Sequence, residues 1–220
     1  MTYSGDVRVG GSPDIREIDG LTVTKIAVGP MDNNAYLLRD ASTGQAILID
    51  AANEAGRLIE LIGDTPVGTI VTTHQHADHW QALADVQKHT GAEVVAHPAD
   101  ADGLPVPVSR AVEHGEVLSF GDAAVSFIHL RGHTPGSIAV VYDAGGRLSG
   151  APHVFTGDSL FPGGVGKTNS PEDFNSLLDD VSERLFGTLP DGTWVYPGHG
   201  KDTTLGTERP HLDEWRERGW

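Results

Sequence analysis

Four short polar stretches, rich in histidine, aspartate and glycine, constrain this chain of 220 residues more than any other feature. They read Thr-His-Gln-His-Ala-Asp-His at 73–79, Gly-His-Thr-Pro-Gly at 132–136, Thr-Gly-Asp-Ser at 156–159 and Pro-Gly-His-Gly at 197–200. Together they supply five imidazoles and two carboxylates, enough to hold two hard or borderline divalent ions close together. Each stretch follows a short apolar run that is typical of a strand. Strand ends are where folds that mix strands and helices usually place their sites, because rigid elements hold the loops there.

Composition excludes several classes of protein and of site. The chain has no cysteine, so any metal must be bound by histidine, aspartate, glutamate or backbone oxygen. The net charge of −16, with no basic stripe, makes nucleic acid a poor partner and is expected to serve solubility. No apolar run approaches the roughly 18 residues of a membrane-spanning helix, and the N-terminal residues lack the basic and apolar blocks of a signal peptide. We therefore expect a cytoplasmic protein with no membrane partner.

The apolar runs predict a mixture of strands and helices. A length of 220 residues with 38% hydrophobic residues favours one domain over residues 1–220, with two closely packed halves as the alternative. One helix is expected to begin at Pro171 and to be capped by Ser170. We expect strands at 21–28, 35–38, 46–50, 67–72, 93–96, 123–130, 137–143, 154–156 and 194–196, and helices at 54–62, 77–89, 171–186 and 211–220.

The first polar stretch alone offers four candidate ligands in six residues. His74 and His76 are two apart in a turn, so both side chains can point at one ion. Asp78 and His79 follow on the first turn of the expected helix and can serve a second ion nearby. Because unpaired buried imidazoles and carboxylates are costly, so dense a group favours a metal over chance.

Three further candidates, His133, Asp158 and His199, each lie in a glycine-flanked loop after an expected strand. Glycine there lets the backbone turn tightly beside a metal ion. Taken singly, each residue is equally well explained as a surface or core side chain that finds a hydrogen bond. Taken together with the first stretch, they predict a metal centre.

The order and spacing of these seven residues resemble those of the metallo-β-lactamase-fold superfamily, over most of the chain from Thr22 to His199. The family's first motif, a lone aspartate at the end of a strand, is matched by Asp50. The resemblance implies an α+β fold, a four-layer αβ/βα sandwich with the site at the edge between two sheets.

The resemblance also implies two divalent metal ions, most often zinc, with iron or manganese as alternatives. One ion would be held by His74, His76 and His133. The other would be held by Asp78, His79 and His199. Asp158 would bridge the two ions, with a hydroxide between them. Asp50 would lie behind the ligands and orient one of them by hydrogen bonding.

Within the superfamily, residues 132–136 and 156–168 look like glyoxalase II and its relatives. This implies a hydrolase that cleaves a small-molecule thioester or ester with the bridging hydroxide, with Asp78 and Asp158 at the reacting centre. Lys167 stands where that group has a basic residue that helps to hold the acidic part of a glutathione thioester. We expect this chain to lack the helical extension that completes the glutathione pocket in that group, because few residues follow His199. This expectation argues against a glutathione thioester as the natural substrate.

Three other functions stay open. Persulfide dioxygenases share the fold and much of the motif set but bind a single iron, and their last motif usually has alanine where Gly198 stands. Lactone hydrolysis would use the same two metals, and a metal-bearing domain without enzymatic activity is the third alternative. The oligomeric state is open too, because Trp215 and Trp220 could pack on a partner subunit or on their own domain.

Overall fold

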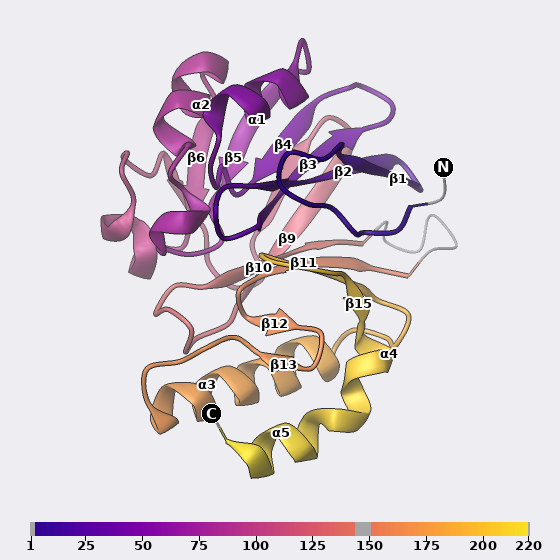
Figure 1. Ribbon diagram of the computed structural model, residues 1–220, viewed down its shortest axis with the longest axis vertical. Coiled ribbons are helices and arrows are strands. Elements are labelled where there is room, and N and C mark those ends of the chain that lie inside the picture. The colour runs from indigo at the N-terminus through magenta and orange to yellow at the C-terminus, as the bar shows by residue number, and fades with distance from the viewer. Residues whose placement is uncertain (1–2, 144–150, 220) are drawn as a thin grey trace.

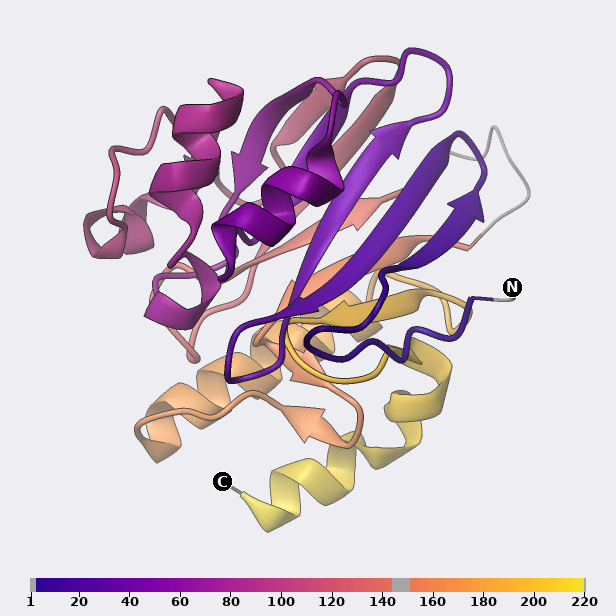
Figure 2. The same ribbon diagram turned by 45° about the horizontal axis from the view of Figure 1, so that its top comes forward.

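Two β-sheets pack face to face, and helices cover the outer face of each, in a computed structural model that describes residues 3–143 and 151–219 (Figure 1). This is the α+β, four-layer αβ/βα arrangement that the resemblance implies. Two views show α1 and α2 on one outer side of the molecule and α3 and α5 on the other (Figures 1 and 2). None of the helices in the described part of the chain is both long and apolar enough to cross a membrane.

The first sheet contains seven strands in chain order. Its strands pair antiparallel from β1 to β4 and parallel from β4 to β7. Helices α1 (Ala55–Ile62) and α2 (Leu83–Thr90) connect β4 to β5 and β5 to β6. The strands are β1 Asp14–Ile18, β2 Leu21–Val28, β3 Asn33–Asp40, β4 Ala46–Ile49, β5 Val67–Val71, β6 Glu93–Ala96 and β7 Arg110–Ala111.

The second sheet contains six strands in the order β15-β14-β11-β10-β9-β8. They are β8 Val117–Phe120, β9 Ala123–His129, β10 Ile138–Tyr142, β11 His153–Gly157, β14 Trp194–Pro197 and β15 Thr203–Thr204. A separate small hairpin joins β12 (Leu160–Phe161) to β13 (Gly164–Val165). The helices of this half are α3 (Pro171–Asp180), which continues as a π-helical segment Val181–Phe186, then α4 (Leu205–Glu208) and α5 (Leu212–Arg218).

Aromatic side chains join the inner faces of the two sheets close to the strand ends. Phe155 and Tyr196 of the second sheet stack with their ring centroids 4.6 Å apart. Tyr36 of the first sheet packs edge-on against Phe155 at 5.1 Å. Pairs of this kind contribute about 0.5–1.5 kcal/mol beyond the area they bury. They hold β3 against β11 and β14 a few residues from the polar loops.

The expected strands are confirmed with small shifts at their ends, and so are three of the four expected helices. Ser170 caps α3 as predicted, because its Oγ accepts a hydrogen bond from the backbone N–H of Asp173 at 3.1 Å. The strands without a clear pattern in the sequence are short or lie at sheet edges, as β1 and β8 do.

The expected helix at 77–89 is wrong as a continuous element. Residues Ala77–His79 form a single 3-10 turn, and α2 starts only at Leu83. Between them, the N–H groups of Gln81 and Ala82 donate to the carbonyls of Ala52 and Ala51 at 3.0 Å each. These bonds to the loop after β4 replace the bonds that would continue a helix, so the ligand-bearing turn is separated from α2.

Trp215 packs on its own chain. Its side chain is 2% exposed, and its ring lies 6.5 Å from that of Phe186 in an edge-on contact. The tryptophan thereby fixes α5 against the π-helical segment that follows α3. Trp220, the other tryptophan considered for a subunit contact, lies outside the described residues.

We expect Trp215→Ala to lower the free energy of unfolding by about 3–5 kcal/mol, because it removes a large buried ring and leaves a cavity. Chemical denaturation followed by circular dichroism measures this. Glu217→Ala, at an exposed position of the same helix, serves as control and should change the free energy by no more than about 0.5 kcal/mol. Equal effects of the two variants would contradict the packing of α5 described above.

Candidate metal centre

The loops that carry the predicted ligands lie together at one edge of the two sheets. The loop after β5 is joined to β10, because the N–H of Ile138 donates to the carbonyl of Thr73 at 2.9 Å. The loop after β14 contacts both sheets: Gly198 donates to the Gly157 carbonyl at 2.8 Å and accepts from the N–H of Asn34 at 2.7 Å. Backbone hydrogen bonds between the sheets therefore set the spacing of the strand ends.

Three histidines form the first group of converging atoms: His74, His76 and His133. Nδ1 of His76 lies 2.9 Å from Nε2 of His133. That same Nε2 atom lies 3.2 Å from Nε2 of His74. Three ring nitrogens thus face a common point, as the ligands of one zinc ion do.

The second group contains Asp78, His79 and His199. Oδ2 of Asp78 lies 3.3 Å from Nε2 of His199 and 3.5 Å from Nε2 of His79. The 3-10 turn places Asp78 and His79 side by side, and the loop after β14 brings His199 from the other sheet. A third converging group, His74, His79 and Asp158, overlaps the first two groups.

The carboxylate of Asp158 lies between the two groups. Its Oδ1 is 3.3 Å from Nε2 of His79, and its Oδ2 is 3.5 Å from Nε2 of His199 and 3.7 Å from Nε2 of His133. A single carboxylate therefore faces imidazoles of both groups. This is the position that a bridging ligand requires.

Nε2 of His79 and Oδ1 of Asp158 are buried and lie 3.3 Å from each other, but neither makes a hydrogen bond of acceptable geometry to a described residue. Leaving a buried polar atom unpaired costs about 1–3 kcal/mol. A divalent cation between the two groups satisfies both atoms, and it also accepts the lone pairs of the other imidazoles. The residues present therefore fit divalent metal ions.

Four of the five imidazoles are anchored through the ring nitrogen that faces away from the centre. When the outer nitrogen donates a hydrogen bond, the inner nitrogen presents its lone pair to a metal. The partners are the Thr73 hydroxyl for His74 (3.0 Å), Asp50 for His79 (2.8 Å), the Lys167 carbonyl for His133 (2.7 Å) and the Met31 carbonyl for His199 (2.9 Å).

Asp50 organises this outer layer. It follows β4 with a left-handed backbone, φ 56°, and is 1% exposed. Its carboxylate accepts from the N–H and the hydroxyl of Thr73 and from Nδ1 of His79, each at 2.8 Å. Since the Thr73 hydroxyl gives its one proton to Asp50, it is left to accept from His74. One carboxylate thus orients a ligand of each group.

The electrostatics of the centre favour neutral imidazoles in the first group and a charged carboxylate at its middle. Burial lowers the pKa values of His74 and His133. Burial alone would raise the pKa of Asp158, but the imidazoles of His199 and His79 outweigh it and hold that pKa well below its usual range. For His79, burial is outweighed by Asp50 and Asp158, which raise its pKa to about 10. Neutral imidazoles and ionised carboxylates are the forms that bind metals, so His74, His133 and Asp158 are in the required form, whereas His79 must release a proton when a metal binds.

Two residues near the centre carry no assigned role in the sequence motifs. Asn33 is buried, and its Nδ2 donates to Oδ2 of Asp78 at 2.8 Å. Asp100 is also buried and accepts from the N–H of Gln75 at 3.0 Å, the hydroxyl of Thr134 at 2.5 Å and the N–H of Gly136 at 2.7 Å. Asp100 thereby joins the loop of the first group to the loop of His133. Its sequence context contains no motif, so only its burial identifies it.

Lys167 lies on the loop after β13, and its backbone carbonyl anchors His133. Its side chain is exposed, and no ion pair to it is found among the described residues. The ring of Phe161 lies 6.4 Å from the ring of His199. The backbone of Lys167 and the ring of Phe161 therefore both lie next to histidines of the centre.

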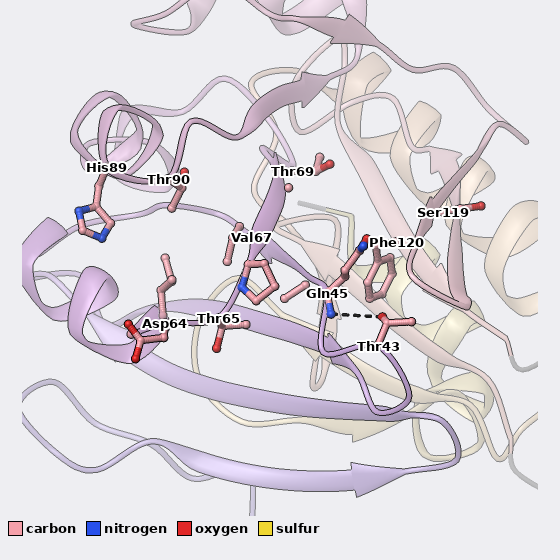
Figure 3. A pocket seen from close by; sticks show the side chains of 15 residues that line it. Thr43, Gln45, Asp64, Thr65, Val67, Thr69, His89, Thr90, Ser119 and Phe120 are labelled. Atoms are coloured by element: carbon pink, nitrogen blue, oxygen red, sulfur yellow. Dashed lines mark hydrogen bonds between the residues drawn. The ribbon is translucent and has the colours of Figure 1, made fainter.

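One cavity lies away from the candidate metal ligands, and a smaller one includes one of them. A cavity of about 680 Å³ is lined by residues near the start of β5, the end of α2 and the end of β8, with Thr69, His89 and Phe120 among them (Figure 3). The ligands follow the other end of β5, so this cavity is remote from them. A smaller cavity of about 390 Å³ is lined by residues 131–135 with Asn169, Asp173 and Ser176. It includes His133, and we regard it as the cavity relevant to the site.

The profile of the Metallo-beta-lactamase superfamily matches residues 28–199, which include every ligand candidate described above. The chain belongs to this superfamily. Its membership agrees with the two packed sheets and with the converging histidines.

Several relatives in sequence are hydrolases by name. Hydroxyacylglutathione hydrolase GloC of Haemophilus influenzae is 30% identical over 210 residues, covering 86% of this chain and 95% of that protein. A hydroxyacylglutathione hydrolase of Fuscovulum blasticum is 34% identical over 171 residues, covering 76% of this chain but 62% of its own length. The chain is thus a metallo-hydrolase of the superfamily with glyoxalase II-like relatives.

Solved structures of similar proteins include one with bound iron. ETHE1 from Myxococcus xanthus superposes with a TM-score of 0.75 and 28% identity, covering 86% of this chain and 82% of that one. TTHA1623, solved in a di-iron-bound form, gives a TM-score of 0.68 and 32% identity, covering 84% and 96%. Members of this superfamily bind divalent metals.

We expect Asp158→Ala to lose at least one of two bound metal ions and most of any hydrolytic activity, because it removes the carboxylate that faces both ligand groups. Metal content after dialysis, measured by elemental analysis, checks this. Thermal unfolding of the metal-free variant serves as the control for the fold. Retention of both ions at full rate would show that Asp158 is not a bridge.

Proposed function

We propose that this chain is a dinuclear metal-dependent hydrolase, with zinc as its metal, that cleaves a small-molecule thioester or ester. The observation that carries the proposal is the position of Asp158, whose two carboxylate oxygens face imidazoles of both ligand groups at 3.3–3.7 Å. The named activity of the glyoxalase II-like relatives supports the thioester.

The residues divide the work of the reaction. When bound, a pair of divalent ions supplies a nucleophile from water at neutral pH and polarises the substrate carbonyl. Asp78 is the candidate acceptor for the proton released there, and the hydrogen bond from Asn33 to its Oδ2 at 2.8 Å holds that carboxylate in place. Thioesters are activated acyl compounds, so no strong general acid is required of the protein.

The charge near the centre favours an anionic substrate. Lys167 is a cation without an ion pair among the described residues, on the loop that anchors His133. Glutathione thioesters carry carboxylates of the kind that such a cation binds. Because a relative named for hydroxyacylglutathione is matched over 95% of its length, we keep glutathione thioesters among the candidate substrates.

A second candidate function, persulfide oxidation at a single iron, is favoured by the likeness to ETHE1. Gly198 provides an argument against it. A Cβ atom at this position would lie 2.2 Å from Oδ1 of Asp158 and 2.6 Å from Cε1 of His79. Glycine therefore leaves space for Asp158 between the two ligand groups, as a two-metal site needs.

Elemental analysis of the purified protein, followed by substrate panels, tests the proposal. We expect close to two zinc ions per chain, together with turnover of acyl-glutathione or other thioesters. Close to one iron with oxygen consumption on a persulfide would overturn it in favour of the dioxygenase. Turnover confined to lactones would keep the metals and change the substrate class, and metals without any turnover would indicate a binding domain.

Gly198→Ala is expected to displace Asp158 and to reduce the metal content from two ions to about one, because the added methyl group occupies the space of the carboxylate. Metal analysis checks this. Gly56→Ala, at a position in α1 with no atom near the added methyl, is the matched control and should keep both ions. A Gly198→Ala protein with both ions would contradict the proposed fit.

Lys167→Ala is expected to raise KM for an anionic thioester roughly two- to fivefold while leaving kcat close to that of the parent, since an exposed charge contributes about 1 kcal/mol or less. Steady-state kinetics measure both constants. Lys88→Ala removes an equally exposed cation from α2 and should leave KM unchanged. If Lys167→Ala behaved like this control, the substrate-binding role would be wrong.

A further inference from the structure

A lysine without any exposed surface lies in the middle of β2. The side chain of Lys25 is 0% exposed. Its ammonium group donates to the carbonyls of Gly5 and Gly200 at 2.8 Å each and to Oδ1 of Asp202 at 2.6 Å. An ammonium has three N–H groups, so each of them is used. None of the sequence motifs includes this residue.

The three acceptors belong to two separate segments of the chain. Gly5 lies in the N-terminal segment 3–6, whereas Gly200 and Asp202 lie in the loop 198–202, which carries His199 between β14 and β15. The N-terminal segment is fastened to the same loop by the Tyr3 hydroxyl on Asp202 at 2.6 Å and by an ion pair of Asp6 and Lys201 at 3.0 Å. Lys25 is the buried point at which both segments meet the first sheet.

The loop 198–202 depends on the first sheet for its anchoring. Nδ2 of Asn34 donates to the carbonyls of Pro197 and Gly200 at 2.9 and 3.0 Å, and the Tyr36 hydroxyl donates to Pro197 at 2.6 Å. Asn34 therefore binds the chain on both sides of His199. Lys25 shares the Gly200 carbonyl with Asn34 and also binds Asp202, and it is the charged member of the set.

The first group of ligands is anchored elsewhere. His133 is held by the Lys167 carbonyl, His74 by Thr73, and the loop between His76 and β10 by Asp100. None of these hydrogen bonds involves the loop 198–202. Asp50 is shared by His74 and His79, but the hydrogen bonds that hold the loop around His199 are separate from those that hold the first group.

We propose that Lys25 is a positioning residue for the half of the metal centre formed by Asp78, His79 and His199, where it holds the loop behind His199. The proposal rests on the two-metal function proposed above. A buried ion pair is often no more stabilising than apolar residues of similar size, so a lysine here is better explained by the carbonyls that it fixes. Groups that orient ligands from behind typically change metal affinity 10- to 100-fold when removed.

Metal titration of the full-length protein, stripped of metal with a chelator, tests the proposal with zinc as the probe. In Lys25→Met we expect one of the two zinc affinities to fall about tenfold or more, while the other stays within about twofold. Isothermal titration calorimetry resolves the two steps. Two unchanged affinities would overturn the proposal.

A double-mutant cycle assigns the loss to one half of the centre. His199→Ala removes a ligand of the second ion and leaves the His74, His76 and His133 group intact. Adding Lys25→Met to His199→Ala should not weaken the remaining ion further, because the two changes act on the same half. A further tenfold loss in the double variant would show a general effect on the fold and would also overturn the proposal.

Two more variants separate positioning from folding. Lys25→Met combined with Asp202→Leu removes both buried charges, so no buried charge is left without its partner, while the bond to the Gly200 carbonyl is still missing. We expect the same selective loss of one zinc affinity in this double variant. Asp40→Asn alters another buried carboxylate, which binds Ser42 and Thr43 at the far end of β3. It should lower stability and leave both affinities unchanged. A parent protein that binds fewer than two ions would contradict the proposed function itself, whereas a failure confined to the Lys25 variants concerns Lys25 alone.

Discussion

The site depends on the burial of imidazoles and carboxylates whose outer atoms are already bound by the protein. Asp50 binds Thr73 and His79 and acts through them on both ligand groups. The inner atoms are left facing one another, and two of them have no partner within the described structure. Such an arrangement is costly unless a cation completes it. The same hydrogen bonds that make the centre rigid therefore make it a site for metals.

The two sheets contribute to the centre unequally. The loop after β5 in the first sheet supplies the ligands from His74 to His79, and the second sheet supplies His133, Asp158 and His199. The distances between the two sets are set by the packing of Tyr36 against Phe155 and by the backbone bonds around Gly198. The hydrophobic core thus positions the chemistry, because neither sheet alone holds a complete group of ligands.

The space beside Asp158 distinguishes the two reactions considered for this protein, hydrolysis at two metal ions and persulfide oxidation at one. Asp158 reaches both groups only because Gly198 has no side chain beside it. The chain is similar both to hydroxyacylglutathione hydrolases and to ETHE1, so proteins with different names share this fold. Function is therefore better argued from the ligand geometry than from the fold. In this chain that geometry favours two ions.

The sequence by itself indicated which residues could bind metal, because the candidate ligands cluster in short motifs that follow apolar runs. The four-layer fold followed from the resemblance of these motifs to those of a known superfamily. Only the tertiary structure decided which groups stand behind the ligands and where the turn at His79 ends. Asn33 reaches Asp78 across 45 residues, and Lys25 reaches Gly200 across 175. Likewise, the helix expected at 77–89 is broken by carbonyls of the loop after β4. Contacts between distant segments leave no periodic pattern in the sequence, since their geometry exists only once the two sheets have packed.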